Sequence, residues 1–295
     1  MKLYFTRHGR TQWNEEHRFQ GQTDIELNAL GREQAELISE NLKDTNISAI
    51  FASPLTRAMD TAREIAKHHD IEVVSDKRLI ERGYGNFEGK NYETITPYDP
   101  DEFWSFGFDK ENIERMDSVY DRIENFLDEI IDNYQDKDVL VVAHGGIYRP
   151  ISCFFDGFPE SGSLEHRRIH NCELKEYTIH SMNLQEKYFN FIKNGTKRIE
   201  LRLNDEKRQK IKVNDTIRFR KNDKSEAMTA KVIGLHHYQT FEDMFKDFDA
   251  ELFADKSISK DEMLKTMEEF YPIEKQKKIG VVGIEIEPIS YRPAN

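Results

Sequence analysis

Residues 3–9 of the chain read LYFTRHG, and residues 139–146 read VLVVAHGG. In both stretches an apolar run of the kind that forms a buried strand leads directly into a histidine and a glycine. Ligands of open α/β sheets bind at the carboxyl ends of the strands. We therefore expect His8 and His144 to lie together at one ligand site.

Amphipathic helices alternate with apolar strands through the first half of the chain. Apolar residues recur at helical spacing over 35–42, 56–68 and 119–131, and residues 47–51 form a further short apolar run. Residues 173–179 have the composition of an edge strand. This alternation predicts an α/β fold whose sheet carries helices on both faces.

The pattern changes near residue 180. A short helix over 187–192 is followed by Asn194-Gly195, which is typical of a helix C-terminus. Alternating runs that predict strands then occur at 199–203, 211–219, 232–235 and 279–286, with a helical stretch at 241–270 between the last two. The sequence thus predicts two domains, residues 1–179 and a smaller, mostly β domain of residues 180–295.

The charge is divided unevenly between these domains. The whole chain has a formal net charge of −12, of which residues 1–179 contribute −14 and residues 180–295 contribute +2. Within the second domain, residues 187–231 hold 14 basic and 6 acidic side chains. These numbers argue against nucleic-acid binding by the whole chain, but they leave a local basic face in the second domain.

Composition indicates a folded cytoplasmic protein. Apolar residues make up 37% of the chain, and no apolar run approaches the roughly 18 residues of a membrane helix. The N-terminus lacks the layout of a signal peptide. Cys153 and Cys172 have no metal-ligand spacing, and we expect both to be reduced thiols. The sequence carries no signal for membrane binding or for an oligomeric state.

The residues around the two histidines suit phosphoryl chemistry. A neutral imidazole is a good nucleophile near pH 7, because its ordinary pKa lies close by. Arg7 adjoins His8, and Arg57 follows the run at 47–51. The planar guanidinium group matches the oxygens of a phosphate. No carboxylate cluster that would hold Mg²⁺ accompanies these residues, so we expect neither a metal nor another cofactor.

Five blocks in order along the chain resemble the histidine phosphatases, the phosphoglycerate mutase-like superfamily. They are Arg7-His8-Gly9 with Thr11 and Asn14, then residues 19–21 (FQG), 53–58 (SPLTRA), 79–89 (LIERGYGNFEG) and 144–146 (HGG). The resemblance covers residues 1–178. It implies a three-layer phosphoglycerate mutase-like domain with a mixed sheet.

The resemblance also implies roles for single residues. His8 becomes phosphorylated, while Arg7, Arg57 and His144 hold the phosphoryl group. Glu81 protonates the leaving oxygen and later activates water, with Glu88 as a competing carboxylate nearby. A small phosphorylated substrate is then bound by a further set of residues: Asn14, Gln20, Gly21, Tyr84 and Gly145.

Two departures favour a phosphomonoesterase over a phosphoglycerate mutase-type phosphotransferase. Tyr92 stands where mutases have a lysine, and residues 102–107 (EFWSFG) contain no basic side chain where mutases have paired arginines. Without these groups the substrate carboxylate has fewer partners. The mutase-type reaction is kept as an alternative, and so is a non-catalytic, RNA-binding regulatory protein, which the intact set of site residues argues against.

Residues 182–202 resemble the start of an ASCH domain, a small β-barrel related to the RNA-binding PUA fold. The signature Gly-x-Lys-x-x-Glu-x-Arg is met by Gly195, Lys197, Glu200 and Arg202. The resemblance implies that the last three bind RNA or a nucleotide.

A regular strand over these residues places Lys197 on the face opposite to Glu200 and Arg202. Two other interpretations stay open, namely a solvated ion-pair network and hydrolysis of acylated cytidine. Glu200 stands where the hydrolases have threonine, which weighs against the second of these. His236-His237 does not form a metal pair if adjacent strand residues point to opposite faces.

Overall fold

The computed structural model describes residues 1–95, 98–255 and 258–289. The chain forms two compact units that divide after Thr178. Residues 290–295 of the predicted second domain lie outside the described residues.

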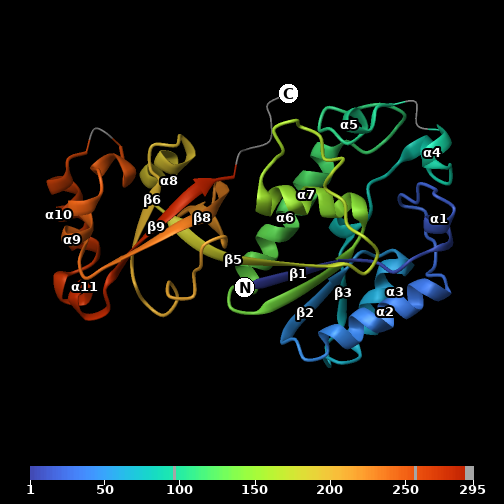
Figure 1. The fold of residues 1–295 in the computed structure, drawn as a ribbon, viewed down its shortest axis with the longest axis horizontal. Helices are drawn as coiled ribbons and strands as arrows, with labels where there is room; N and C mark the ends of the chain where they lie inside the picture. The colour runs from blue at the N-terminus through green and yellow to red at the C-terminus, as the bar shows by residue number, and fades with distance from the viewer. Residues whose placement is uncertain (96–97, 256–257, 290–295) are drawn as a thin grey trace. The chain divides into compact units, whose positions relative to one another are not determined.

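The first unit is built on a mixed sheet (Figure 1). Four parallel strands lie in the order β3 (Val73–Ser75), β2 (Ile47–Ala52), β4 (Asp138–Ala143) and β1 (Lys2–Arg7). The first half of β5 (Leu174–Leu184) pairs antiparallel with β1 through residues 174–178. Because β1 and β4 are parallel neighbours, their carboxyl ends bring His8 and His144 to the same edge of the sheet.

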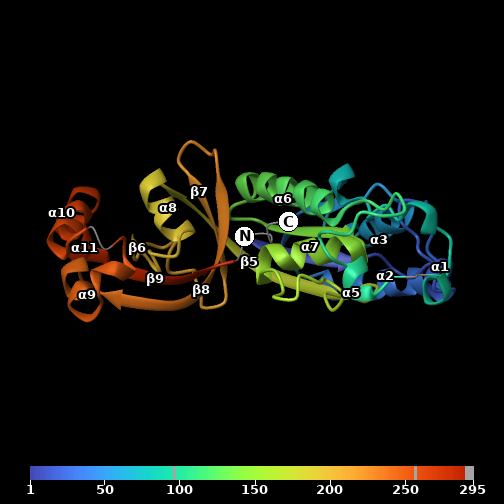
Figure 2. The same ribbon diagram turned by 90° about the horizontal axis from the view of Figure 1, so that it is seen from above.

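Helices cover both faces of this sheet, which makes three layers (Figure 1, Figure 2). On one face α2 (Ala29–Leu42) and α3 (Thr56–Ala66) pack through Ile38 and Ala62 against Leu140. On the other face lie α6 (Met116–Asn133) and α7 (Gly145–Asp156), where the rings of Phe51 and Phe126 are 5.4 Å apart. The predicted fold class is therefore confirmed for this unit.

Helix α7 is not predicted from the sequence, because Gly145, Gly146 and Pro150 weigh against a helix. This helix is buried on nearly all sides, from Gly146 to Phe155. Tertiary packing therefore outweighs local propensity. Short elements complete the unit: α1 (Gln12–Glu15), η1 (Lys77–Leu79), η2 (Gly85–Phe87), α4 (Tyr92–Ile95) and α5 (Pro100–Phe103).

The second unit is a strand-rich α+β domain. Its strands lie in the order β5 (residues 179–184), β7 (Thr216–Lys221), β8 (Ala227–Tyr238), β9 (Val281–Pro288) and β6 (Ile199–Leu203), with β5 and β7 parallel. The guanidinium group of Arg202 on β6 donates to the carbonyl of Asn183 on β5 at 3.2 Å. This bond links the strands at the two ends of the order.

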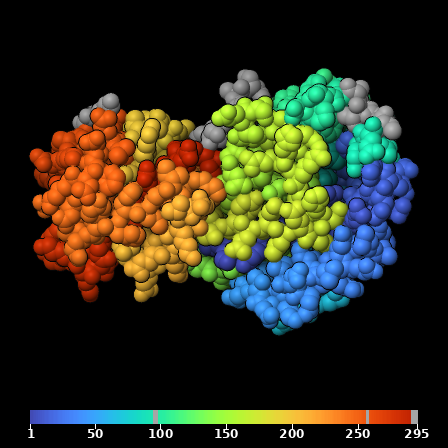
Figure 3. Space-filling view, viewed as in Figure 1, coloured from blue at the N-terminus to red at the C-terminus, as the bar shows by residue number. Residues whose placement is uncertain are grey.

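Helices cover the sheet of this unit on two sides. They are α8 (Glu186–Lys193), α9 (Phe241–Asp247), η3 (Ala250–Leu252), α10 (Lys260–Phe270) and α11 (Ile273–Ile279). On the face drawn in Figure 3, the orange and red residues of α9 to α11 form one side of the unit's surface. The helices of the described residues are all too short or too polar to span a lipid bilayer.

Three boundaries predicted for this unit are wrong. Ile211–Asn214 is not part of a strand, because Lys212 and Asp215 close a turn in which Asn214 has a φ of +75°. The predicted helical stretch is interrupted after Asp247 and resumes at Lys260. Ile279 ends α11 rather than beginning a strand, since Gly280 with a φ of +77° separates it from β9.

Candidate active site

His8 lies at the carboxyl end of β1 and is only 2% exposed. Its Nδ1 is 2.7 Å from the carbonyl oxygen of Gly9. A carbonyl only accepts, so Nδ1 carries the proton and Nε2 keeps a free lone pair. Burial, helped by the charges of Arg57 and Arg7, holds the pKa of His8 well below its ordinary value. His8 is therefore a neutral imidazole with a nucleophilic nitrogen.

His144 caps the N-terminus of α7 at the end of β4, with its ring centroid 5.1 Å from that of His8. Its Nε2 lies 2.7 Å from the hydroxyl of Ser53. Burial and then Arg57 lower the pKa of His144 as well. Gly145 is the first residue of this twelve-residue helix, whose backbone N–H groups and dipole favour an anion.

Two arginines supply the positive charge of the site. Arg57 on α3 is fully buried and donates to the carbonyls of Thr23 at 2.9 Å and Gly21 at 2.8 Å. Burial lowers the pKa of Arg57 to about 10, so it is charged at neutral pH. Arg7 donates to the carbonyl of Ile169 at 3.1 Å, and burial also lowers its pKa.

Glu81 follows η1 and is 7% exposed. One carboxylate oxygen accepts from the N–H of Arg82 at 2.8 Å, and the other accepts from the N–H of Gly146 at 3.2 Å. Burial is the largest influence and raises the pKa of Glu81. A Cβ on Gly146 would lie 2.3 Å from a Glu81 oxygen, so only glycine permits this approach. A carboxyl with a raised pKa suits proton donation.

Glu88, the competing carboxylate, has a structural role, because its side chain bonds to backbone N–H groups. Its side chain accepts from the backbone N–H groups of Gln22 at 3.0 Å, Thr23 at 3.1 Å and Tyr84 at 3.1 Å. These bonds hold the loop that presents the Gly21 and Thr23 carbonyls to Arg57. Glu88 therefore contributes to the site through this loop.

The predicted binding residues lie around these groups. Tyr84 is buried, and its hydroxyl would lie 3.1 Å from a Cβ on Gly146. Gly21 has a φ of +53° and accepts from Arg57. The Asn14 side chain accepts from the N–H of Thr11 at 3.1 Å and so caps α1.

Four buried polar atoms of the predicted site residues have no hydrogen-bond partner within the described part of the chain. They are Arg7 Nε, Arg57 Nε, His144 Nδ1 and Gln20 Oε1. Buried polar groups are nearly always paired, since an unpaired one costs about 1–3 kcal/mol. Both arginine nitrogens, and Nδ1 of His144 when it carries the proton, can donate. Unpaired donors around a neutral histidine are the arrangement that an anion completes.

Two residues near this site, Asn171 and Arg149, are not predicted from the sequence. The side chain of Asn171 donates to the carbonyl of His8 at 2.8 Å. Arg149 on α7 lies with its guanidinium carbon 3.6 Å from the ring centroid of Trp104. Neither residue has a local sequence signal, and the partner of Asn171 is 163 positions away.

The signature residues of the second unit form a buried ion network. Lys197, 3% exposed, uses Nζ to contact the carbonyls of Ile199 and Phe253, each at 2.9 Å, and the carboxylate of Glu200 at 3.2 Å. Glu200 also pairs with Arg202 at 2.6 Å. The expectation that Lys197 lies opposite Glu200 is wrong, because the regular strand begins only at Ile199. Burial also means that the network is not a solvated one.

Comparisons with known proteins identify both parts of the chain. The fold and the site define a phosphoryl-transfer protein built around a pair of histidines. The chain belongs to the histidine phosphatase superfamily (branch 1), whose family model matches residues 3–191. A model of the ASCH domain matches residues 182–290. The predicted resemblances, fold class and enzyme class are thereby confirmed.

Relatives of the first part include enzymes with different names. The uncharacterized phosphatase PhoE of Bacillus subtilis is 35% identical over 59% of this chain and 93% of its own length. Phosphoglycerate mutase-like protein 4 of Arabidopsis thaliana is also 35% identical, over 51% and 69% of the two lengths. The metal-independent phosphoserine phosphatase of the same plant is 31% identical, over 59% and 77%.

Solved structures give the same family. A phosphoserine phosphatase from Entamoeba histolytica, in complex with 3-phosphoglyceric acid, is 27% identical with a TM-score of 0.53. The match covers 60% of this chain and 89% of that one. YhfR of Bacillus stearothermophilus is 29% identical with a TM-score of 0.54, over 60% and 91% of the two chains.

Proposed function

We propose that the first unit hydrolyses small phosphate monoesters through a phosphohistidine intermediate on His8. In the first step Nε2 of neutral His8 bonds to phosphorus, the bond from phosphorus to the leaving oxygen breaks, and Glu81 gives that oxygen its proton. In the second step the Glu81 carboxylate takes a proton from water, whose oxygen bonds to phosphorus while the bond from phosphorus to Nε2 of His8 breaks and its electron pair returns to the imidazole. Inorganic phosphate and neutral His8 are released.

The remaining site residues stabilise the transferring group in this proposal. Arg7, Arg57 and His144 donate to the non-bridging phosphate oxygens, where charge accumulates in the transition state. The backbone N–H of Gly145 adds the N-terminus of α7. Asn14, Gln20, Gly21 and Tyr84 line the substrate side.

One observation carries the proposal. Nε2 of His8 is unprotonated, and it lies among buried donors that have no partner within the described residues. Phosphoserine phosphatases among the relatives support a small substrate with a phosphate ester. The absence of a basic side chain at residues 92 and 102–107 favours hydrolysis over transfer between two positions of a phosphoglycerate.

The first prediction concerns turnover by the purified full chain. It should hydrolyse p-nitrophenyl phosphate, phosphoserine or 3-phosphoglycerate in the presence of a chelator, since arginines supply the charge. His8→Ala should abolish turnover and keep the thermal unfolding transition. Quenching the wild-type reaction in an alkaline denaturant should trap phosphate on His8, because the phosphorus–nitrogen bond of phosphohistidine survives in base and is hydrolysed in acid. Activity that a chelator removes and a divalent cation restores would contradict the metal-independent mechanism, and normal turnover by His8→Ala would contradict the intermediate.

For the second unit we propose an RNA or nucleotide ligand. The ASCH match and the basic surplus of residues 187–231 support it. The Nζ group of Lys197 already has three partners within the protein. In contrast, Nε of Arg202 has no partner among the described residues. In this proposal Lys197 and Glu200 orient Arg202, and exposed basic side chains such as Arg198 and Lys212 contact phosphates.

The second prediction tests this ligand class with the His8→Ala chain, which leaves phosphate esters intact. Short single-stranded RNAs and mononucleotides should bind at low salt, and binding should weaken as salt rises. Arg198→Ala and Lys212→Ala should weaken binding further. Lys246→Ala, an exposed lysine outside the basic segment, is the matched control. If no RNA or nucleotide binds even at low salt, the proposal is wrong.

A further inference from the structure

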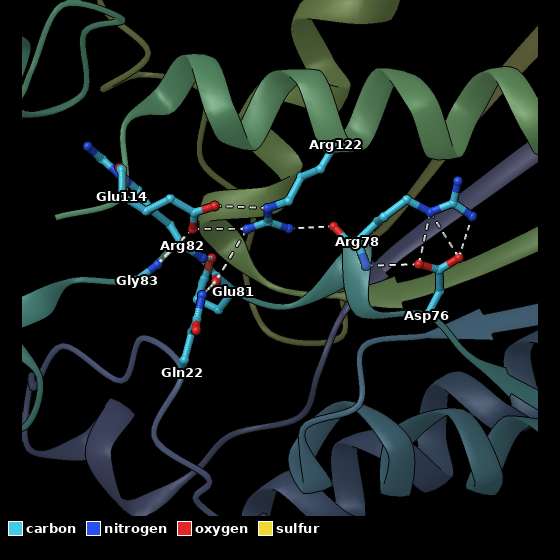
Figure 4. Close-up of polar contacts among 8 residues, drawn as sticks. All are labelled: Gln22, Asp76, Arg78, Glu81, Arg82, Gly83, Glu114 and Arg122. Atoms are coloured by element: carbon cyan, nitrogen blue, oxygen red, sulfur yellow. Dashed lines mark hydrogen bonds and ion pairs between the residues drawn. The ribbon is translucent and has the colours of Figure 1, made fainter.

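A network of side chains lies behind the loop that carries Glu81 (Figure 4). The loop, residues 78–83, runs from η1 past Glu81 to Gly83. Arg122, which projects from α6, and Glu114, which precedes that helix, face it. The side chains of both are mostly buried, with 17% and 23% of their area exposed.

Arg122 contacts the loop through two of its nitrogens. One terminal nitrogen donates to the carbonyl of Arg78, and the other lies 3.4 Å from the carbonyl of Glu81. Gln22 donates to the same Glu81 carbonyl at 3.1 Å from another direction. The backbone of Glu81 is therefore held by two side chains from distant parts of the chain.

Glu114 orients Arg122 and also contacts the loop. Its two carboxylate oxygens lie 3.0 Å and 3.2 Å from Nε and a terminal nitrogen of Arg122, which is a bidentate pair. The second of these oxygens accepts from the N–H of Gly83 at 3.0 Å. The backbone of Glu114 exchanges further bonds, with the Gly83 carbonyl at 2.8 Å and the Arg82 side chain at 2.7 Å.

The position of the Glu81 carboxyl group depends on this backbone. Within the described residues its side chain is held only by the N–H groups of Arg82 and Gly146. One of these two donors belongs to the loop itself. A displacement of the loop therefore moves both the carboxyl group and one of its anchors. A shift of about 1 Å in a catalytic group can cost on the order of 100-fold in rate.

We infer that Arg122, oriented by Glu114, is a positioning residue that sets the location of Glu81 for proton transfer to the leaving group. The inference rests on the proposed function, in which Glu81 is the general acid. Arg122 contacts the carbonyl of Glu81 and not its carboxyl group, so its influence on the reaction passes through the loop.

The third prediction compares two substrates, which distinguishes the positioning of Glu81 from a non-specific loss of active-site structure. An alkyl phosphate such as phosphoserine needs its leaving oxygen protonated, whereas p-nitrophenyl phosphate does not. Arg122→Ala should reduce kcat/KM for phosphoserine by about 10- to 100-fold and for p-nitrophenyl phosphate by much less, since kcat/KM reports the steps up to release of the leaving group. Glu114→Gln, which keeps the shape of the side chain, should act in the same direction. It also serves as the test if Arg122→Ala does not fold.

Two further variants make the result specific. Arg63→Ala removes an exposed arginine of α3 that pairs with Asp60 at 3.4 Å and lies outside the Glu81 loop. It should leave the ratio of the two rates unchanged. Arg122→Lys keeps the charge but loses the planar fork that spans Glu114 and two carbonyls, so it should not restore the ratio. Full recovery with lysine would overturn the positioning role in favour of a charge effect.

The pH profile gives an independent readout. A loosened loop exposes Glu81 to water and lowers its raised pKa, so the basic limb for phosphoserine should move to lower pH in Arg122→Ala. Loss of a positive charge alone would move that limb to higher pH. Glu81→Gln tests the role of Glu81 as the general acid separately from the role of Arg122 as the positioning residue. If it lowers kcat/KM, which reports the steps up to release of the leaving group, equally for both substrates, the proposed acid is wrong. If it is selective but Arg122→Ala is not, only the inference fails.

Discussion

At the scale of single residues, burial shifts the pKa values of His8 and Glu81 in opposite directions. His8 and Glu81 are both buried, and burial favours the neutral form of each. Neutral is the useful state for both, because a nucleophile needs a lone pair and a general acid needs a proton. The lowered pKa of the imidazole extends its neutral range to lower pH, and the raised pKa of the carboxyl group extends its protonated range to higher pH.

The fourth prediction follows from these opposite shifts. Activity on an alkyl phosphate should fall as the pH rises through the raised pKa of Glu81, because the acid has then lost its proton. Glu81→Gln should remove this basic limb and slow phosphoserine hydrolysis by about 100-fold or more. Rates for p-nitrophenyl phosphate should persist to higher pH in both proteins. Profiles of kcat/KM against pH for the two substrates check this. An unchanged basic limb in Glu81→Gln would assign the acid to another group.

At the scale of elements, the loop after β1 depends on close contact with α2. A Cβ on Gly31 of α2 would lie 2.0 Å from the carbonyl oxygen of Arg10, and a Cβ on Gly9 would lie 2.3 Å from the carbonyl oxygen of Gly31. These neighbours are backbone atoms, which cannot rotate away. The helix and the turn next to His8 therefore approach through two glycines.

The fifth prediction uses this contact. Gly31→Ala should force α2 away from residues 9–10, which costs about 1–3 kcal/mol of stability and displaces the turn that follows His8. Thermal unfolding should begin at a lower temperature, and turnover of p-nitrophenyl phosphate should fall. Gly107→Ala is the matched control, since a Cβ added at Gly107 would meet no atom within 4 Å apart from those of its chain neighbours. Equal stability of the two variants would show that the α2 contact adapts without cost.

At the scale of the whole molecule, two units with separate cores share one chain. The first unit buries α2 and α3 on its sheet, and the second buries Phe189 and Phe219 in a cluster of its own. Strand β5 contributes residues 174–178 to one sheet and residues 179–184 to the other. The proposed phosphatase residues all belong to the acidic unit, and the proposed RNA or nucleotide residues all belong to the unit with the basic segment.

The sequence by itself predicted the fold class and the residues that gather at the first site. His8 and His144 could be paired because each follows an apolar strand, and parallel strands end at the same edge. Arg57 and Glu81 were found through ordered motifs. Such signals are local, because each apolar strand run and each motif consists of residues that are close together in the sequence.

Only the tertiary structure decided how those residues are held and which of them are available. Lys197 donates to the carbonyl of Phe253, 56 positions away in the sequence, and Arg122 contacts the carbonyl of Glu81, 41 positions away. The network behind the Glu81 loop and the burial of Lys197 have no local pattern. Contacts of this kind arise because distant segments pack together. Packing determines which N–H groups bond within the protein and which can donate to a ligand.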